Sequence, residues 1–156
     1  MVPILQHKKE GLYCPAGKFY VDPRGSVELA IITHAHSDHA RTGHNSYLCS
    51  DITKPLLKVR LGSKPKIESM PFGKTIKIGD AFVSLHPAGH ILGSSQVRIE
   101  VGGCVWVISG DYKPCPDTTC EPFELVSCHG FITECTFGLP VYCWPPEEVV
   151  YAQINN

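Results

Sequence analysis

The sequence predicts an α/β fold, built mainly of short strands around one hydrophobic core. The chain of 156 residues has the length of a single domain with a sizeable core, and its hydrophobic content of 43% is ordinary for a globular protein. Most of the chain consists of short apolar or alternating runs, which predict strands, and turn-forming residues lie between these runs. Few segments have a helical pattern. No internal repeat or low-complexity tract interrupts this organisation.

The predicted elements follow in chain order. A strand at residues 19–21 ends in the turn Asp22-Pro23-Arg24-Gly25, and a buried strand follows at residues 29–33. Ser37 suits a helix N-cap, so one helix is expected after it and another over residues 55–61. Further strands are expected at residues 75–78, 81–86, 96–101 and 104–109, the last two joined by a Gly102-Gly103 hairpin turn. Residues 131–136 are strand-like.

The last residues, 144–156, have the pattern of a helix with proline in its first turn. Only about two turns of it are present, and a complete domain rarely stops there. We therefore expect the sequence to be part of a longer protein.

Composition narrows the cellular setting. No apolar run approaches the twenty residues of a membrane span, and the N-terminus lacks the order of a signal peptide. We therefore expect a cytoplasmic protein with reduced thiols. Five cysteines crowd the last third without a CxxC pair, and we expect them to be buried structural residues rather than a second zinc site. These are Cys115, Cys120, Cys128, Cys135 and Cys143.

The net charge of −1 hides an asymmetry. Half of the 14 basic residues lie at positions 54–77, where Glu68 is the one acidic residue, whereas acidic residues dominate from Asp111 onward. Such a basic segment can contact a polyanion, although it also suits a solvated surface. The candidate contacts to substrate phosphates are Lys54, Lys58, Arg60, Lys64 and Lys66.

Residues 33–39, Thr-His-Ala-His-Ser-Asp-His, are the strongest indication of chemistry. Imidazole and carboxylate at this density suit a divalent ion such as zinc. His34 and His36 lie two apart at a strand end, so they would point the same way and bind one ion. Asp38 and His39 would face a second ion. One motif can therefore supply ligands to two metals.

Two further segments place candidate ligands at strand ends. His90 lies between Gly89 and Gly93, after the strand that ends at His86. Asp111 follows the strand at residues 104–109, and its two oxygens could bridge two ions.

With these residues the sequence resembles the metallo-β-lactamase superfamily, since its first three metal-binding motifs occur in order. The surroundings of His90 and Asp111 are similar to those of the β-CASP nuclease branch, and Glu134 matches that branch's first accessory acidic motif. Residues 11–17, 120–123 and 131–140 resemble the bacterial DNA ligase-associated exonucleases, which are related to mRNA 3′-end processing factors.

The resemblance implies the N-terminal part of an αββα sandwich at residues 1–138, with a mixed sheet and flanking helices. Residues 139–156 would begin a β-CASP insert, truncated there. A further histidine ligand and a general-acid histidine come from a later segment in this family, and this sequence has no such segment.

The resemblance also implies two zinc ions, with manganese as the alternative. His34, His36, His90 and Asp111 would hold one ion, whereas Asp38, His39 and the shared Asp111 would hold the other. The catalytic residues would be Asp38, Asp111 and Glu134, and Asp22 would support the ligands, although an aspartate before proline also suits a turn. His86 lies within its strand, so we expect it to pack there or to support a ligand.

The implied function is that of a zinc-dependent DNA exonuclease that works beside a DNA ligase in repair, with hydroxide between the metals attacking phosphorus. RNA 3′-end processing is the nearest alternative. Small-molecule hydrolysis of the thioesterase or lactonase type, and a catalytically incomplete metal-binding fragment, stay open. We expect no membrane partner, and we expect self-association because an open sheet leaves an unpaired edge.

Overall fold

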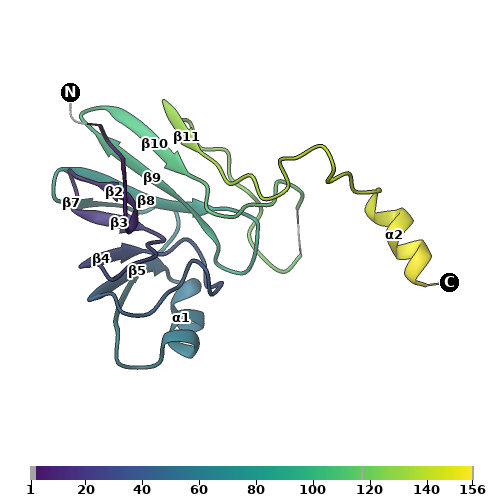
Figure 1. Ribbon diagram of the computed structural model, residues 1–156, viewed down its shortest axis with the longest axis horizontal. Helices are drawn as coiled ribbons and strands as arrows, with labels where there is room; N and C mark the ends of the chain where they lie inside the picture. The colour runs from purple at the N-terminus through teal and green to yellow at the C-terminus, as the bar shows by residue number, and fades with distance from the viewer. Residues whose placement is uncertain (1–2, 117, 156) are drawn as a thin grey trace.

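The protein is described from a computed structural model, which covers residues 3–116 and 118–155. Two mixed β-sheets pack against each other, and helix α1 (Thr53–Leu61) lies beside the first sheet (Figure 1). These layers confirm the α/β prediction. No helix of the described residues is long and apolar enough to cross a membrane.

The first sheet has six strands, whose order in space is their order in the chain. Strands β1 to β3 are antiparallel, and β3 to β6 are parallel. The carboxyl ends of β3 and β4 therefore lie at one edge of the sheet, and Asp22 and residues 33–39 follow them there. The strands are β1 (Gln6–Lys8), β2 (Gly11–Cys14), β3 (Phe19–Val21), β4 (Leu29–Ile31), β5 (Ser46–Ser50) and β6 (Lys66–Met70).

The second sheet has five strands, four of them antiparallel, with β11 parallel to β10 at one edge. Gly102 and Gly103 form the β9–β10 turn with φ angles of 57° and 80°, which confirms the predicted hairpin. The strands are β7 (Thr75–Ile78), β8 (Ala81–Pro87), β9 (Ser95–Val101), β10 (Cys104–Ile108) and β11 (Gly130–Ile132).

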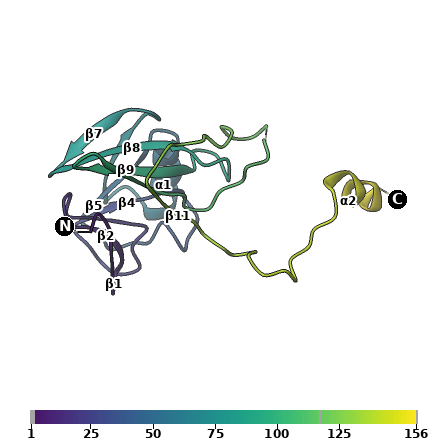
Figure 2. The same cartoon turned by 90° about the horizontal axis from the view of Figure 1, so that it is seen from above.

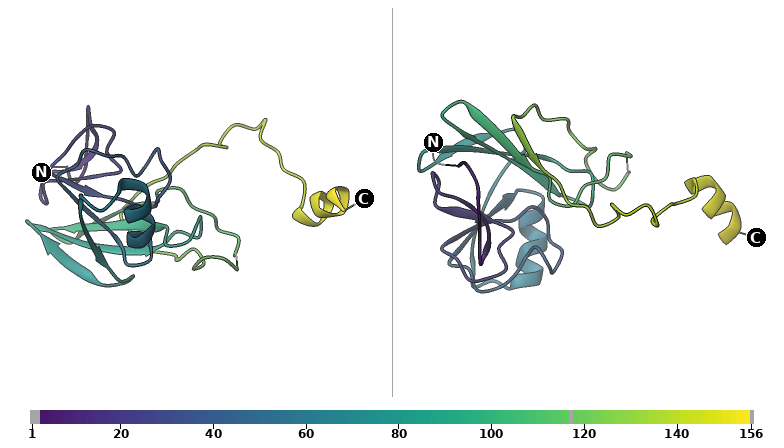
Figure 3. Two further views of the ribbon diagram at one scale, coloured as in Figure 1. Left: turned by 90° about the horizontal axis from the view of Figure 1, so that it is seen from below. Right: turned by 45° about the horizontal axis from the view of Figure 1, so that its top comes forward.

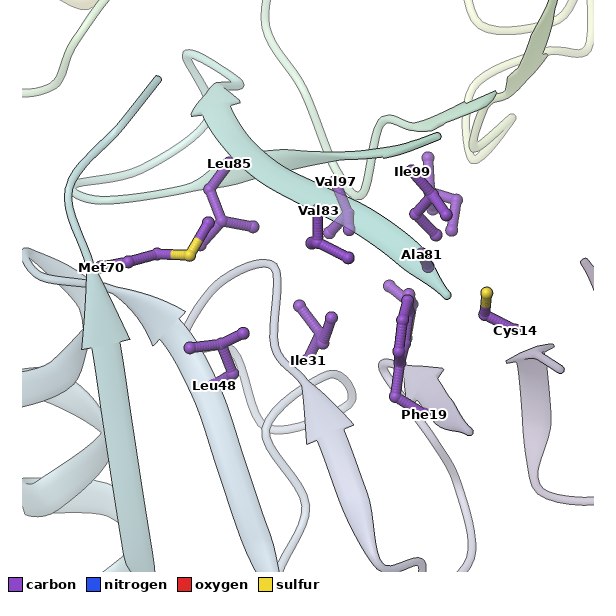
Figure 4. Close-up of a cluster of buried hydrophobic side chains, with 12 residues drawn as sticks. Cys14, Phe19, Ile31, Leu48, Met70, Ala81, Val83, Leu85, Val97 and Ile99 are labelled. Atoms are coloured by element: carbon purple, nitrogen blue, oxygen red, sulfur yellow. The ribbon is translucent and has the colours of Figure 1, made fainter. Parts of the chain in front are cut away.

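The main core lies between the two sheets. In Figure 4, Ile31 and Leu48 of the first sheet face Val83 and Leu85 of the second. Alternation along β4 sends Ile31 into this core, and the neighbouring Ala30 into a second apolar cluster with Leu57 of α1. Strands β4 and β5 are therefore buried on both faces, which explains the apolar run at residues 29–33.

The helix predicted after Ser37 is wrong. The residues form a single turn, in which the carbonyl of His36 accepts the amides of His39 at 3.2 Å and Ala40 at 2.8 Å. Gly43, at a φ angle of 95°, follows within one further turn of chain and redirects it toward β5.

After β11 the chain leaves the two sheets, as Figures 2 and 3 show. Helix α2 (Glu147–Ile154) confirms the helix expected near the end, but it lies away from both sheets rather than against them. The predicted strand at residues 131–136 is shorter, since β11 ends at Ile132. The proposed division between residues 138 and 139 stays a prediction.

The cysteine prediction for this region is also wrong. Cys115, Cys128, Cys135 and Cys143 are exposed, and Cys120 is partly exposed. The short strand β11 pairs only with β10, so no further sheet covers these side chains among the described residues.

Candidate metal centre

Ligand-type side chains gather where loops from both sheets meet. Residues 33–39 follow β4 of the first sheet, whereas His90 follows β8 and Asp111 follows β10 of the second. The carbonyl of Thr33 accepts the amide and the hydroxyl of Ser95, each at 2.8 Å. These hydrogen bonds join the two sheets directly beside the cluster.

His34, His36, His90 and Asp111 each offer one ligand atom, and these atoms lie within 4.8 Å of one another. His36 Nδ1 is 3.0 Å from His34 Nε2 and 3.3 Å from His90 Nε2. Asp111 Oδ2 is 3.7 Å from each of those Nε2 atoms. Tetrahedral zinc with bonds of about 2.0–2.1 Å needs its ligand atoms about 3.3–3.4 Å apart. The four side chains therefore fit a single zinc ion.

The second donor set lies on the other side of Asp111. Asp111 Oδ1 is 3.3 Å from His39 Nε2, which is 3.6 Å from Asp38 Oδ2. One oxygen of Asp111 thus faces the first set and the other faces the second. This is the arrangement of a carboxylate that can bridge two cations.

Asp22 orients histidines of both sets. Its Oδ2 lies 2.8 Å from His39 Nδ1 and accepts the Thr33 hydroxyl at 2.6 Å, while Oδ1 accepts the Thr33 amide at 2.9 Å. Since the Thr33 hydroxyl donates to Asp22, its oxygen is left to accept the Nδ1 proton of His34 at 3.0 Å. This tautomer leaves His34 Nε2 unprotonated toward the cluster.

The protonation of these histidines follows from their surroundings. Burial, together with the neighbouring imidazoles of His39, His36 and His90, lowers the pKa of His34 to about 2. Burial likewise lowers the pKa of His90. Burial also pushes the pKa of His39 down, but the hydrogen bond and charge of Asp22 and the charges of Asp111 and Asp38 outweigh it, so that this pKa is raised. His34 and His90 are therefore held in the neutral form that binds metals.

Two close backbone contacts fix the positions of Asp111 and His90. Gly110 has a φ angle of 57°, and a Cβ there would lie 2.8 Å from Thr33 Cβ. The Ser94 hydroxyl accepts the amide of His90 at 3.0 Å. The carbonyl of Gly93, in the same loop, accepts the hydroxyl of Thr53 at the start of α1 at 2.8 Å.

Glu134 lies beside the centre without a hydrogen bond to any of the candidate ligands in the described part of the chain. Its carboxylate accepts the amide of Thr136 at 2.6 Å. It lines a hollow of about 340 Å³ together with Asp22, His39 and Asp111. Its negative charge acts to raise the pKa of His90, against the larger effect of burial.

His86 is not placed against a metal ligand, contrary to the prediction that it supports one. Its Nε2 lies 2.9 Å from the Ser84 hydroxyl, and its Nδ1 lies 2.9 Å from Glu124 Oε1. The reason is its position within β8, opposite Gln96 of β9, which turns both ring nitrogens to groups outside the cluster.

The five basic residues predicted to contact phosphates lie on α1 and on the segment that follows it. Lys66, the last of them, pairs with Glu68 at 2.9 Å. Arg60 is different, because its Nε donates to the carbonyl of Ala35 within residues 33–39, which we call the ligand loop. The roles of all five stay predictions.

Sequence reasoning missed Thr33, Arg24 and Arg41. Thr33 directly precedes His34, and its signal was its place at the end of a strand-like run. Arg24 and Arg41 line a hollow beside the ligand loop, together with Arg60. Neither belongs to the basic segment, so charge counting along the chain could not find them.

Comparison with known proteins gives matches to both DNA- and RNA-related proteins. A protein named as a probable DNA ligase from Opitutus terrae is 38% identical over 147 residues, which is 92% of this chain and 14% of the relative. The endoribonuclease YSH1 of Gibberella zeae is 30% identical over 115 residues, 70% of this chain and 14% of that protein. The chain thus spans about one seventh of the length of these relatives. No protein-family model matches it.

Among solved structures, a CmlA β-hydroxylase mutant superposes with a TM-score of 0.50 at 18% identity, over 66% of this chain and 29% of that one. This likeness concerns the fold alone. The metallo-β-lactamase fold protein YhfI from Bacillus subtilis gives a TM-score of 0.48 at 14% identity, over 64% of this chain and 52% of that one.

Proposed function

The chain has the metallo-β-lactamase fold, and its homologues include a probable DNA ligase and Ysh1-type endoribonucleases; on this premise we propose that it supplies the metal centre of a nucleic-acid phosphodiesterase. The proposed activity is that of a DNA exonuclease associated with a DNA ligase. The ligase relative supports DNA as the substrate, because the match to it covers the larger share of this chain. A cytoplasmic location belongs to the same proposal.

One observation carries it: the carboxylate of Asp111 presents one oxygen to the set of His34, His36 and His90 and the other to His39. Bound there, two divalent ions would activate a water for attack and neutralise charge that develops on a phosphoryl group. Zinc is proposed for both positions, with manganese as the alternative.

Residues beside the two donor sets hold the ligand side chains in position. Asp22 fixes the tautomers of His34 and His39, so that in the neutral form of each ring the nitrogen facing its donor set carries no proton. Asp38 is 68% exposed in its side chain, so it can reach both an ion and substrate. Glu134 lines the same hollow. Its proposed role is to act through its negative charge on His90 and not to bind a metal ion.

RNA cleavage is the second candidate, and the endoribonuclease relatives favour it. The donor sets do not separate the two substrates, because a phosphodiester is common to DNA and RNA. A third candidate is a chain that binds metal without turnover. This candidate is kept because the second donor set has three side chains among the described residues, Asp38, His39 and Asp111, whereas the first set has four.

Metal content and hydrolysis, measured together, test this proposal. The protein is loaded with zinc or manganese, and bound metal is counted by elemental mass spectrometry for the wild type and for Asp111→Ala. Hydrolysis of bis(p-nitrophenyl) phosphate, end-labelled DNA and end-labelled RNA is then followed. Exposed Asp80→Ala is the matched control.

We expect two ions per chain, a loss of at least one in Asp111→Ala and none in Asp80→Ala, and DNA cleavage that depends on Asp111. Faster RNA cleavage would select the second candidate. Two bound ions without hydrolysis of any of the three substrates would select the third. Zinc content that Asp111→Ala leaves unchanged would refute the proposed centre itself.

A further inference from the structure

A basic hollow lies beside the ligand loop, on a part of the surface that the metal centre does not use. It has a volume of about 460 Å³ and is lined by Arg24, Arg41 and Arg60 together with Ser37 and Thr42. No acidic residue of the described chain lines it. Three arginines around one hollow, with no carboxylate in its described lining, form an environment that favours an anion.

Two of the arginines are held in place by the ligand loop itself. Arg41 Nε donates to the carbonyl of Asp38 at 3.2 Å, and Arg60 Nε donates to the carbonyl of Ala35. The hydroxyl of Tyr47 donates to the carbonyl of Arg41 at 3.0 Å, which fixes the backbone at this position as well.

In each case Nε is engaged by a backbone carbonyl, so the terminal Nη groups are left to bind a ligand. Within the described part of the chain, none of the three arginines forms an ion pair with a carboxylate. Arg41 and Arg60 are therefore preorganised donors, because their side-chain freedom has already been reduced before an anion arrives.

The hollow of the arginines and the hollow at the metal centre share one lining residue, Arg24. The second of these hollows is also lined by His39 and Asp111. Ser37, which also lines the hollow of the arginines, directly precedes Asp38 in the chain. A ligand with one phosphate at the metal centre would need only to extend past Arg24 to place another phosphate between the arginines.

We propose that Arg24, Arg41 and Arg60 form a binding subsite for a nucleic-acid phosphate adjacent to the one at the metal centre. The inference rests on the proposed function and deepens it, because it requires a polynucleotide rather than a single phosphodiester. It also moves the main phosphate contacts from the lysines of positions 54–66 to arginines around the ligand loop, with Arg60 common to both. Arginine suits this role because its planar fork binds a phosphate with two hydrogen bonds.

The test measures binding of a fluorescent single-stranded oligonucleotide by anisotropy, in EDTA so that no turnover occurs, across a series of salt concentrations. The variants are Arg24→Gln, the triple Arg24→Gln/Arg41→Gln/Arg60→Gln, and the triple Lys58→Gln/Lys64→Gln/Lys66→Gln, which removes the same charge from the exposed neighbouring segment. Arg24→Gln is informative by itself, because it removes no side-chain hydrogen bond between Arg24 and the described residues. Zinc content and circular dichroism check that each variant is folded.

We expect the arginine triple to weaken binding at least 10-fold and to reduce the slope of log Kd against log salt by about 0.7 for each phosphate that the variant no longer neutralises. Arg24→Gln should show part of this effect, and the lysine triple should stay within 2-fold of the wild type. Equal losses of affinity in both triples would overturn the proposal in favour of general charge attraction. Unchanged binding in the arginine triple, or no binding by the wild type, would also overturn it.

Hydrolysis of bis(p-nitrophenyl) phosphate separates this inference from the proposed function. That substrate has no neighbouring phosphate, so its hydrolysis by the wild type does not depend on the subsite. If the wild type hydrolyses it while the oligonucleotide results are negative, the subsite fails and the metal centre stands. If the wild type does not hydrolyse it, the proposed function fails, whatever the arginines bind.

Discussion

Asp22 shows how one carboxylate can serve several ligands at once. It accepts two hydrogen bonds from Thr33 and faces His39 Nδ1, and through the Thr33 hydroxyl it also sets the tautomer of His34. Its φ angle of 44° is uncommon for a residue with a side chain, although aspartate tolerates it better than most. In this backbone conformation both carboxylate oxygens of Asp22 contact residues 33–39, Oδ1 at Thr33 and Oδ2 at Thr33 and His39.

Replacing Asp22 tests this role. Asp22→Asn puts an amide where His39 and Thr33 need acceptors, so we expect metal affinity to fall about 10- to 100-fold, as for other supports of metal-bound histidine. Competition with a chromophoric chelator measures the affinity. The control is Asp80→Asn, an exposed aspartate in the β7–β8 turn. Equal affinities for Asp22→Asn and the wild type would rule out the orienting role.

The histidines also predict a pH dependence for the metal-free protein. Folding lowers the pKa of His34 from 6.5 to about 2. Below pH 6.5, His34 is therefore protonated in the unfolded chain but stays neutral in the folded chain. Stability should therefore fall as the pH drops below about 6.5, by up to about 1.4 kcal/mol per pH unit from this residue. His39 has the opposite sign. Its raised pKa adds stability that is complete below pH 6.5 and is lost as the pH rises through the folded value.

Urea unfolding in EDTA at pH 5.5, 6.5 and 7.5 measures this dependence. We expect the lowest free energy of unfolding at pH 5.5. Greater stability at pH 5.5 than at pH 6.5 would contradict the expectation that the lowered pKa of His34 outweighs the raised pKa of His39.

At the scale of elements, the end of β10 depends on the close approach of Gly110 to Thr33. Gly110→Ala would place its Cβ 2.8 Å from Thr33 Cβ, so Asp111 should shift away from the ligand loop. Gly103→Ala is a matched control, because its φ angle of 80° is also left-handed but no atom lies within 4 Å of its Cβ. Both variants should lose about 1 kcal/mol from backbone strain.

Only Gly110→Ala should also weaken zinc binding, by about 10-fold or more, which calorimetric titration measures. If the two variants bind zinc equally, the contact with Thr33 does not position Asp111.

The sequence predicted the strands that alternate or run apolar, and it placed β7 and the β9–β10 hairpin well. It missed β1, β2, β5 and β6, although β5 and β6 are parallel strands of the first sheet. Glu68 and Lys66 interrupt the apolar pattern of β6, because that strand lies at the edge of the sheet. The place of a strand at the edge of a sheet depends on tertiary structure, so it cannot be predicted from the sequence pattern of that strand alone.

The helix expected after Ser37 failed for a related reason. An N-cap residue favours a helix only where the following residues can continue it. Here the chain must turn at Gly43 to reach β5, so one turn is all that forms. The candidate ligands could nevertheless be found from the sequence, since strand ends place them at one edge whatever the local helix does. Arg24 and Arg41 could not, because their proximity to Arg60 depends on how α1 packs.

At the scale of the whole molecule, a metal ion at this centre would connect the two sheets. His34 and His36 belong to the first sheet's loops, whereas His90 and Asp111 belong to the second's. Metal that binds the folded chain stabilises it by about 2.7 kcal/mol at 100 times its Kd. Chelation should therefore lower the melting temperature by several degrees.

Differential scanning calorimetry with and without EDTA measures this shift. In Asp111→Ala the shift should be much smaller, while in Asp80→Ala it should be retained. A melting temperature that does not respond to EDTA in the wild type, after zinc loading, would show that the centre does not connect the sheets.

The separation of the cluster residues along the chain has a kinetic consequence. His34 and Asp111 come from opposite sheets, so their ligand atoms meet only once the interface between the sheets has closed. Contacts that form after the folding transition state alter the unfolding rate and leave the folding rate nearly unchanged. We expect the two sheets to close after the folding transition state. Bound zinc should then lower the unfolding rate and leave the folding rate nearly unchanged.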